Sequence, residues 1–308
     1  MAVTSRLRNV IESQQFSRSL LEDLYARADE MKREPHRFIG RLAGQVMAAL
    51  FYEPSTRTRL SFEAAMLRLG GQTMGTDNAR EFSSAAKGET LEDTIRIVSG
   101  YADVIVLRHS EEGAARRAAS VSTVPIINAG DGPGQHPTQA LLDLYTIRAE
   151  LGRIDGVHVA MVGDLANGRT VRSLVYLLSK FKDIKLWFVA PPQVAMRDDL
   201  KAHLDEKGVS WEETEDLDAI LPKADVIYQT RIQKERFTDE ASYLAVKGIY
   251  RIDSRALGLM RSDAIVMHPL PRVDEIAPEV DTDRRAAYFR QARNGLFTRM
   301  ALLDRLLS

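Results

Sequence analysis

The sequence predicts an α/β protein made of two open parallel-sheet α/β domains. Its 308 residues suggest about two domains, each large enough for a core of its own. In both halves, short apolar runs typical of buried strands alternate with segments that repeat apolar residues at helical spacing. Such alternation is typical of parallel sheets covered by helices. Hydroxyl and guanidinium side chains follow several of the predicted strands, which indicates a protein that binds anions.

The first half contains three predicted strands and three predicted helices. The apolar runs that predict strands are residues 46–52, 104–107 and 124–128. The amphipathic segments that predict helices are residues 60–69, 91–98 and 138–151. The last helix follows Pro137 and is expected to carry the chain into the second domain, so the first domain is placed at residues 1–135.

The second half repeats the alternation. Its predicted strands are residues 158–163, 185–189, 225–229 and 264–267, and its predicted helices are residues 169–181, 196–207 and 217–221. We place the second domain at residues 136–286. The amphipathic C-terminal segment, residues 287–308, is expected to pack back on the first domain.

Composition restricts the kinds of function. Hydrophobic residues make up 44% of the chain, charged residues 28%, and the formal net charge is −1, as in soluble globular enzymes. No nucleic-acid partner is expected, because no excess of positive charge is present. The chain has no cysteine, which excludes disulfides, thiolate nucleophiles and cysteine-ligated zinc. Residues 1–12 lack an apolar core region, so we predict a soluble, cytoplasmic protein without a membrane partner.

Residues 51–63 are the most informative stretch, because Ser55, Thr56, Arg57 and Thr58 stand where a strand gives way to a helix. Backbone N–H groups at a helix start lack partners within the helix and carry the positive end of its dipole, so they can bind phosphate. The hydroxyls add donors, and a guanidinium can grip two phosphate oxygens. The alternative is an ordinary N-cap with solvent-exposed arginines, but four consecutive phosphate-compatible donors disfavour it.

The other candidate residues also follow predicted strands. Open α/β sheets bind ligands outside the carboxyl ends of their strands. The residues found there are Thr58, Arg108, His136, Arg169, Arg231, Leu270 and Pro271. Their recurrence at this position predicts one functional site.

The motif Ser-Thr-Arg-Thr-Arg at residues 55–59 resembles the phosphate loop of the transcarbamoylases. Further stretches resemble aspartate transcarbamoylase catalytic chains: SSAAKGETLED (83–93), GDGPGQHPTQALLDL (130–144), MVGDLANGRTV (161–171), TRIQKER (230–236) and HPLPRVDEI (268–276). Together they span nearly the whole chain. Ornithine transcarbamoylases share the first motif but typically have cysteine in the place of Pro269, and this chain has no cysteine. The resemblance implies the transcarbamoylase fold, with the active site between the two domains.

The resemblance also implies a reaction. The amine of L-aspartate would attack the carbonyl of carbamoyl phosphate and give N-carbamoyl-L-aspartate and phosphate through a tetrahedral intermediate, an early step of pyrimidine synthesis. Neither a metal nor an organic cofactor is implied. The alternatives are a transcarbamoylase for ornithine or another amino acid, and a non-catalytic transcarbamoylase-like scaffold. The general base stays open, since the departing phosphate can itself accept the proton.

Site residues follow from the resemblance. The implied catalytic residues are Thr58, Arg108, His136 and Lys87. The implied carbamoyl phosphate site consists of Ser55, Thr56, Arg57, Thr58, Ser83, Arg108, His136, Gln139, Leu270 and Pro271. The implied aspartate site consists of Lys87, Arg169, Arg231 and Gln233. The alternatives from the residues alone are a capping role for His136 and a surface arginine at Arg169, although a cation at a helix start opposes the dipole.

Oligomeric state is implied in the same way. Ser83 and Lys87 lie in a polar loop that, by itself, would be a solvated surface loop. In transcarbamoylases this loop reaches the neighbouring subunit's site, which implies a homotrimer with shared active sites. Residues 112–116 resemble the surface that meets a regulatory chain in allosteric family members, and the alternative is an ordinary charged helix start at the surface. The resemblance implies a regulatory chain or a dihydroorotase as a partner.

Overall fold

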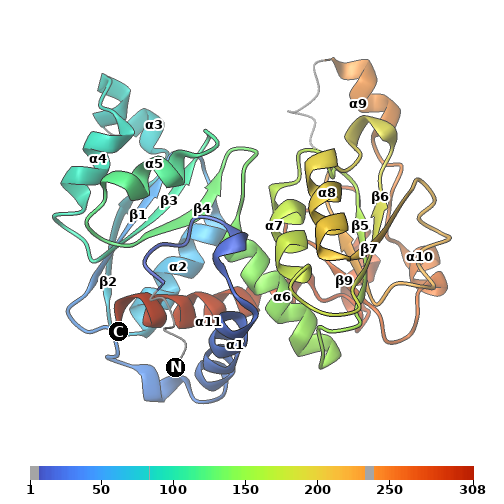
Figure 1. Ribbon diagram of the computed structural model, residues 1–308, viewed down its shortest axis with the longest axis horizontal. Coiled ribbons are helices and arrows are strands. Elements are labelled where there is room, and N and C mark those ends of the chain that lie inside the picture. Colours follow the sequence, from blue (N-terminus) through green and yellow to red (C-terminus); the bar gives the residue numbers. More distant parts are fainter. Residues whose placement is uncertain (1–6, 83, 233–238) are drawn as a thin grey trace. The chain divides into compact units, whose positions relative to one another are not determined.

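The computed structural model describes residues 7–82, 84–232 and 239–308 (Figure 1). The chain divides into two compact units, Met1–Leu142 with Arg293–Ser308, and Asp143–Ala292. Both divisions fall inside helices: the first inside α6 (Pro137–Leu151) and the second inside α11 (Tyr288–Leu307). The sequence had placed the divisions at residues 135/136 and 286/287, close to the starts of these two helices.

The first unit contains a four-stranded parallel sheet in the order β2-β1-β3-β4. Its strands are β1 (Val46–Phe51), β2 (Gln72–Thr76), β3 (Val104–His109) and β4 (Ile126–Asp131). Its helices are α1 (Arg18–Arg33), α2 (Thr56–Arg68), α3 (Ala79–Phe82), α4 (Leu91–Val98) and α5 (Ala114–Val121), with the adjoining parts of α6 and α11.

Buried side chains hold the first unit together. On one face of the sheet, Leu50 and Leu107 pack against Ile95 of α4 and Ala118 of α5. The C-terminal part of α11 is fixed to the same unit by its buried Asp304. This carboxylate accepts hydrogen bonds from Arg27 Nε at 2.8 Å and from Arg41 Nε at 2.7 Å.

The second unit contains a five-stranded parallel sheet in the order β7-β6-β5-β8-β9. Its strands are β5 (His158–Val162), β6 (Lys185–Val189), β7 (Ser210–Thr214), β8 (Val226–Gln229) and β9 (Ile265–Met267). Its helices are α7 (Arg169–Leu178), α8 (Asp198–Lys207), α9 (Glu240–Val246) and α10 (Ser254–Leu259). One face of the sheet packs Val162, Ile227 and Val266 against residues of α10 and of the turns before β8.

A buried carboxylate lies in the core of this unit. Asp143 is fully buried, and it accepts hydrogen bonds from Tyr228 Oη and from Gln291 Nε2, each at 2.6 Å. Burial and the neighbouring carboxylate raise the pKa of Tyr228. The phenol therefore stays protonated and ties β8 to the second-unit part of α6.

The predicted fold class is confirmed, and each predicted strand and all but one of the predicted helices are present. The predicted helix at residues 217–221 is wrong, because this segment forms turns. The Asp216 carboxylate accepts a hydrogen bond from Ala219 N–H and closes a local turn. Five residues are also too few for a helix without strong tertiary support.

Candidate active site

The order of the strands indicates where ligands bind in each unit. In the first sheet the chain order reverses between β1 and β3, and in the second between β5 and β8. At such a point, the loops that follow the two adjacent strands run in opposite directions, which leaves a crevice outside the carboxyl ends of the strands. The candidate residues Thr58 and Arg108 follow or end β1 and β3, while Arg169 and Arg231 follow β5 and β8.

The loop from β1 into α2 presents donors that the protein does not use internally. Ser55 occupies the N-cap position, but its hydroxyl makes no capping bond. No hydrogen bond or ion pair joins the side chains of Ser55, Thr56, Arg57 or Thr58 to any part of the chain that the structure describes. Arg59 differs, because its guanidinium pairs with both Glu63 and Asp77.

Arg57 is exposed, yet the protein around it removes part of its hydration, and this desolvation lowers its pKa. A guanidinium stays protonated at neutral pH even so. An incoming anion would restore the lost stabilisation. The unused charge of Arg57 therefore favours binding of a phosphate at this loop.

Arg108 is fixed at the end of β3 by its neighbours. Only 15% of its side chain is exposed. Its Nη1 donates to the Ala129 carbonyl at 3.3 Å, and its Nη2 lies 3.5 Å from Glu53 Oε2. Its own carbonyl accepts a hydrogen bond from Tyr52 N–H at 2.9 Å. These contacts place the guanidinium between the loop after β1 and the end of β4.

His136 precedes α6, which starts at Pro137, one residue before the predicted helix of residues 138–151. Both His136 and Gln139 are buried. The loop before His136 is held by Asp131, whose Oδ1 accepts hydrogen bonds from Gln135 N–H and Asn128 Nδ2, each at 3.0 Å. Sequence reasoning missed Asp131 and Asn128, because nothing in their local pattern separates them from other polar residues after a strand.

In the second unit, Gly163 brings the ends of β5 and β8 close together. A Cβ at this position would lie 2.4 Å from the carbonyl oxygen of Thr230, and Gly163 has a φ of +112°. Thr230 is itself held to β5, because its N–H and its Oγ1 donate to the Val162 carbonyl at 2.8 Å and 2.9 Å. Glycine is therefore required between the loops that carry Arg169 and Arg231.

Replacing Gly163 with alanine is expected to destabilise the protein by ~3 kcal/mol, because the new methyl group would meet backbone and the φ is unfavourable. Gly208 is the matched control: its φ is +65°, but no atom lies within 4 Å of a Cβ there. Gly208→Ala is expected to cost only ~1 kcal/mol. Urea unfolding of both variants measures the difference, and equal losses would contradict the close-approach argument.

The loop between β5 and α7 is organised by a buried carboxylate. Asp164 is fully buried, and its Oδ1 accepts hydrogen bonds from Asn167 N–H at 3.0 Å and from Asn167 Nδ2 at 3.1 Å. The Asn167 carbonyl then accepts the Arg169 N–H at 3.0 Å. Arg169 starts α7 and is half-buried, as is Arg231 after β8. Sequence reasoning missed Asp164 and Asn167, although an Asp-x-x-Asn pattern after a strand predicts such a turn.

The remaining candidate residues lie as follows. Leu270 follows β9 with its N–H bonded to His268 Nδ1 at 2.7 Å, and Pro271 is exposed. Lys87 is exposed at the end of a short 3-10 turn. Ser83 and Gln233 lie outside the described residues. Within the described residues, no group of three or more potential ligands could hold a metal ion, and no helix is long and apolar enough to cross a membrane.

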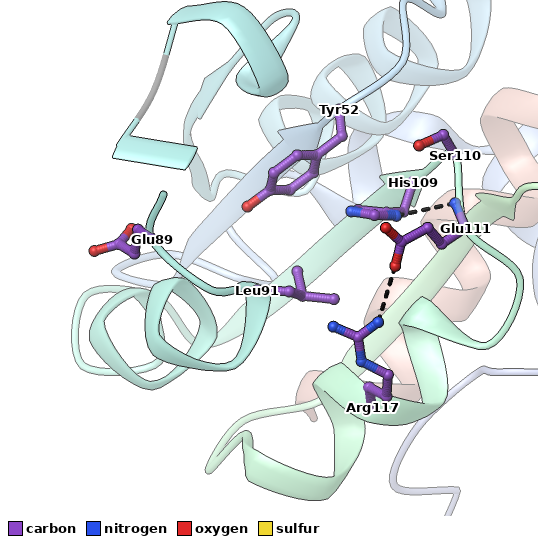
Figure 2. Close-up of a pocket in the computed structure, with 7 residues that line it drawn as sticks. All are labelled: Tyr52, Glu89, Leu91, His109, Ser110, Glu111 and Arg117. Carbon is purple, nitrogen blue, oxygen red and sulfur yellow. Dashed lines mark hydrogen bonds and ion pairs between the residues drawn. The ribbon is translucent and has the colours of Figure 1, made fainter. Parts of the chain in front are cut away.

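A pocket of about 300 Å³ lies beside the carboxyl ends of β1 and β3 (Figure 2). It is lined by Tyr52, Glu89, Leu91, His109, Ser110, Glu111 and Arg117. The pocket contains none of the candidate residues. Its one arginine is already paired with Glu92 and Glu111, and burial lowers the pKa of its histidine. We therefore assign the anion site to the neighbouring loop after β1.

Comparison with known families agrees with this geometry. Residues 8–149 match the family model of the aspartate/ornithine carbamoyltransferase carbamoyl-P binding domain. Residues 155–306 match the model of the Asp/Orn binding domain of the same family. The chain belongs to the aspartate/ornithine carbamoyltransferase family.

Relatives with high sequence identity to the chain are named as aspartate carbamoyltransferases. The chain is 61% identical over 304 residues to the chloroplastic aspartate carbamoyltransferase of Arabidopsis thaliana, covering 98% of this chain and 78% of the relative. It is 48% identical to the aspartate carbamoyltransferase catalytic subunit of Clostridium novyi, covering 97% and 98%. A crystal structure of Trypanosoma cruzi aspartate transcarbamoylase with carbamoyl phosphate and aspartate is 45% identical, with a TM-score of 0.92 and coverage of 98% and 97%.

Proposed function

We propose that this chain is an aspartate carbamoyltransferase, which transfers the carbamoyl group of carbamoyl phosphate to the amine of L-aspartate in pyrimidine synthesis. The observation that carries the proposal is the set of side-chain hydrogen-bond donors after β1 that no described residue engages. They lie where the strand order of the first sheet reverses between β1 and β3. The family and the relatives named as aspartate carbamoyltransferases support it.

The first unit supplies the groups that recognise carbamoyl phosphate. The phosphate oxygens accept hydrogen bonds from the backbone N–H groups at the start of α2 and from the guanidinium of Arg57. They also accept from the hydroxyls of Ser55, Thr56 and Thr58. Arg108 and His136 lie at the ends of the adjacent strand and loop. Gln139 lies one turn into α6, where its amide orients the carbamoyl group.

The second unit supplies the groups that recognise aspartate. Two carboxylates call for forked donors, and Arg169 and Arg231 occupy the loops at the reversal of the second sheet. Leu270 offers its backbone carbonyl, which is a hydrogen-bond acceptor suited to the attacking amine. Gln233 completes the proposed aspartate set, whereas Ser83 belongs to the proposed carbamoyl phosphate set.

The chemistry follows from these donors. The amine nitrogen attacks the carbonyl carbon, and the carbonyl oxygen becomes negatively charged. Thr58, Arg108 and His136 stabilise that oxygen, which is the largest expected contribution to catalysis. The bond from carbon to the phosphate oxygen then breaks, the departing phosphate takes the amine proton, and N-carbamoyl-L-aspartate remains.

The purified chain with carbamoyl phosphate tests the function directly. L-Aspartate and L-ornithine are supplied side by side, and the ureido product is measured. Product with aspartate alone is the expected result. Product with ornithine would mean that the chain is an ornithine carbamoyltransferase. No product with either amino acid would favour a non-catalytic scaffold.

We further propose a homotrimer in which Lys87 serves a neighbouring subunit's site. Lys87 is exposed, and no ion pair joins it to another residue within the described part of the chain. Leu60 and Leu67 lie on one face of α2 with 56% and 59% exposure, and Ile39 is 74% exposed. Such exposed apolar side chains favour a second copy as the partner that covers them. A regulatory chain at residues 112–116 is a separate proposal, as is a dihydroorotase partner.

Mixing two inactive variants tests the shared site. In a mixed trimer of Lys87→Ala and Arg57→Ala subunits, one of the interfaces joins the intact Arg57 of one subunit with the intact Lys87 of the next. Roughly a third of the sites are therefore intact. Denaturing and refolding the two variants together is therefore expected to restore activity that neither shows alone. Hybrids without activity would place both residues in the site of a single subunit.

A further inference from the structure

His268 and Glu275 form a buried pair beneath the loop that carries Leu270. Both residues are less than a tenth exposed. His268 Nε2 lies 2.8 Å from Glu275 Oε1, and His268 Nδ1 lies 2.7 Å from Leu270 N. Neither residue is among those that we assign to substrate binding, so their arrangement needs a different explanation.

The contacts determine the tautomer of the histidine. The Leu270 N–H is a donor, so Nδ1 must be an unprotonated acceptor. Nε2 then carries the ring proton and donates it to the Glu275 carboxylate. A protonated Nδ1 would face a second donor and lose the bond to Leu270. The carboxylate thus selects the histidine tautomer that can hold the backbone of Leu270.

Glu275 fixes the other end of the loop. Its Oε2 accepts hydrogen bonds from Val273 N–H and Asp274 N–H, each at 3.1 Å. Burial alone would raise the pKa of Glu275, but the hydrogen bonds from His268 and the backbone outweigh burial and lower the pKa. The glutamate therefore stays ionised and accepts from both sides of the loop.

The backbone of Leu270 requires such support. Its φ is +55°, which lies in the left-handed region. For a residue with a Cβ, this backbone conformation is less stable than the usual ones by about 1 kcal/mol or more. The base of the loop is fixed as well, because His268 N–H donates to Gln291 Oε1 at 2.9 Å and Gln291 in turn donates to Asp143. The direction of the Leu270 carbonyl is therefore set by this network.

We propose that His268 and Glu275 are positioning residues for carbamoyl transfer, which hold the Leu270 carbonyl in the orientation that receives the attacking amine. The inference rests on the proposed function. A misplacement of about 1 Å in such a group can cost about 100-fold in rate. The pair therefore affects turnover without touching either substrate.

Two amide variants separate this role from simple packing. His268→Asn keeps an acceptor near the position of Nδ1 and loses the donor to Glu275. His268→Gln keeps a donor near the position of Nε2 and loses the acceptor for Leu270 N–H. Both remove the ring and leave a cavity of similar kind. Positioning predicts a kcat for the glutamine variant that is about 10-fold or more below that of the asparagine variant, at similar Tm and similar KM for carbamoyl phosphate.

The outcomes are distinct. The positioning role would be overturned by an equal kcat in the two variants, or by a decrease in kcat that only parallels the decrease in Tm. Either result would leave the proposed function intact. A wild-type chain that makes no ureido product would instead overturn the proposed function. Glu275→Gln is the second variant, should the histidine variants not fold. If its one oxygen accepts from His268, its amide nitrogen can accept from neither Val273 N–H nor Asp274 N–H. A drop in kcat of about 10-fold is therefore expected, and an unchanged kcat would overturn the role.

Discussion

Replacing Arg57 with alanine is expected to reduce kcat/KM for carbamoyl phosphate by about 1,000-fold, with little change in stability. The loss is large because the guanidinium would bind phosphate oxygens through charge-assisted hydrogen bonds. Stability is preserved because no described residue pairs with Arg57. Initial rates over a range of carbamoyl phosphate concentrations, together with thermal unfolding, measure both effects.

Arg59 provides the control from the same helix. Its guanidinium pairs with Glu63 at 2.7 Å and with Asp77, and only 23% of its side chain is exposed. Arg59→Ala is therefore expected to cost ~1 kcal/mol of stability and to change kcat/KM by no more than a few-fold. If Arg57→Ala lost stability rather than activity, the phosphate would have to bind elsewhere.

Replacing Arg169 with alanine is expected to raise KM for aspartate by about 100-fold and to leave KM for carbamoyl phosphate within a few-fold of wild type. The reason is that a forked donor at the start of α7 is lost from the proposed carboxylate site. Substrate saturation curves for each substrate in turn separate the two constants.

Arg172, one turn further along α7, is the matched control. It pairs with Asp199 and lies 5.7 Å from the centre of the Tyr176 ring, so its contacts are made within the protein. Arg172→Ala is expected to lower Tm and to leave KM for aspartate unchanged. An equal rise in KM for both arginine variants would mean that disruption of α7, rather than loss of a specific donor, affects aspartate binding.

The buried strands could be predicted from the sequence, including the edge strands β4 and β9, whereas the two exposed edge strands could not. β1, β5 and β8 are almost wholly buried and therefore appear as continuous apolar runs. β2 and β7 lie at the edges of their sheets and are mostly exposed or half-buried. Their sequences, QTMGT and SWEET, carry polar and charged side chains that protect an edge from pairing with another chain, and this conceals the strand pattern.

The same contrast applies to the candidate site. The donors after β1 could be predicted because they are adjacent in sequence and follow a recognisable strand. The supporting groups could not, because their function depends on contacts that the fold creates. His268 meets Glu275 only through the turn of its loop. Glycine is needed at position 163 because its φ is +112° and because the carbonyl of Thr230, which directly follows β8, lies close to it.

The outer position of β7 gives the molecule a practical property. Ser210 is exposed at the start of this edge strand, which carries none of the candidate residues. Because the chain has no cysteine, Ser210→Cys would introduce a single thiol with almost no change in side-chain size. A fluorophore or spin label attached there would report from one known place on the second unit, so substrate-dependent motion could be followed without removing any native residue first.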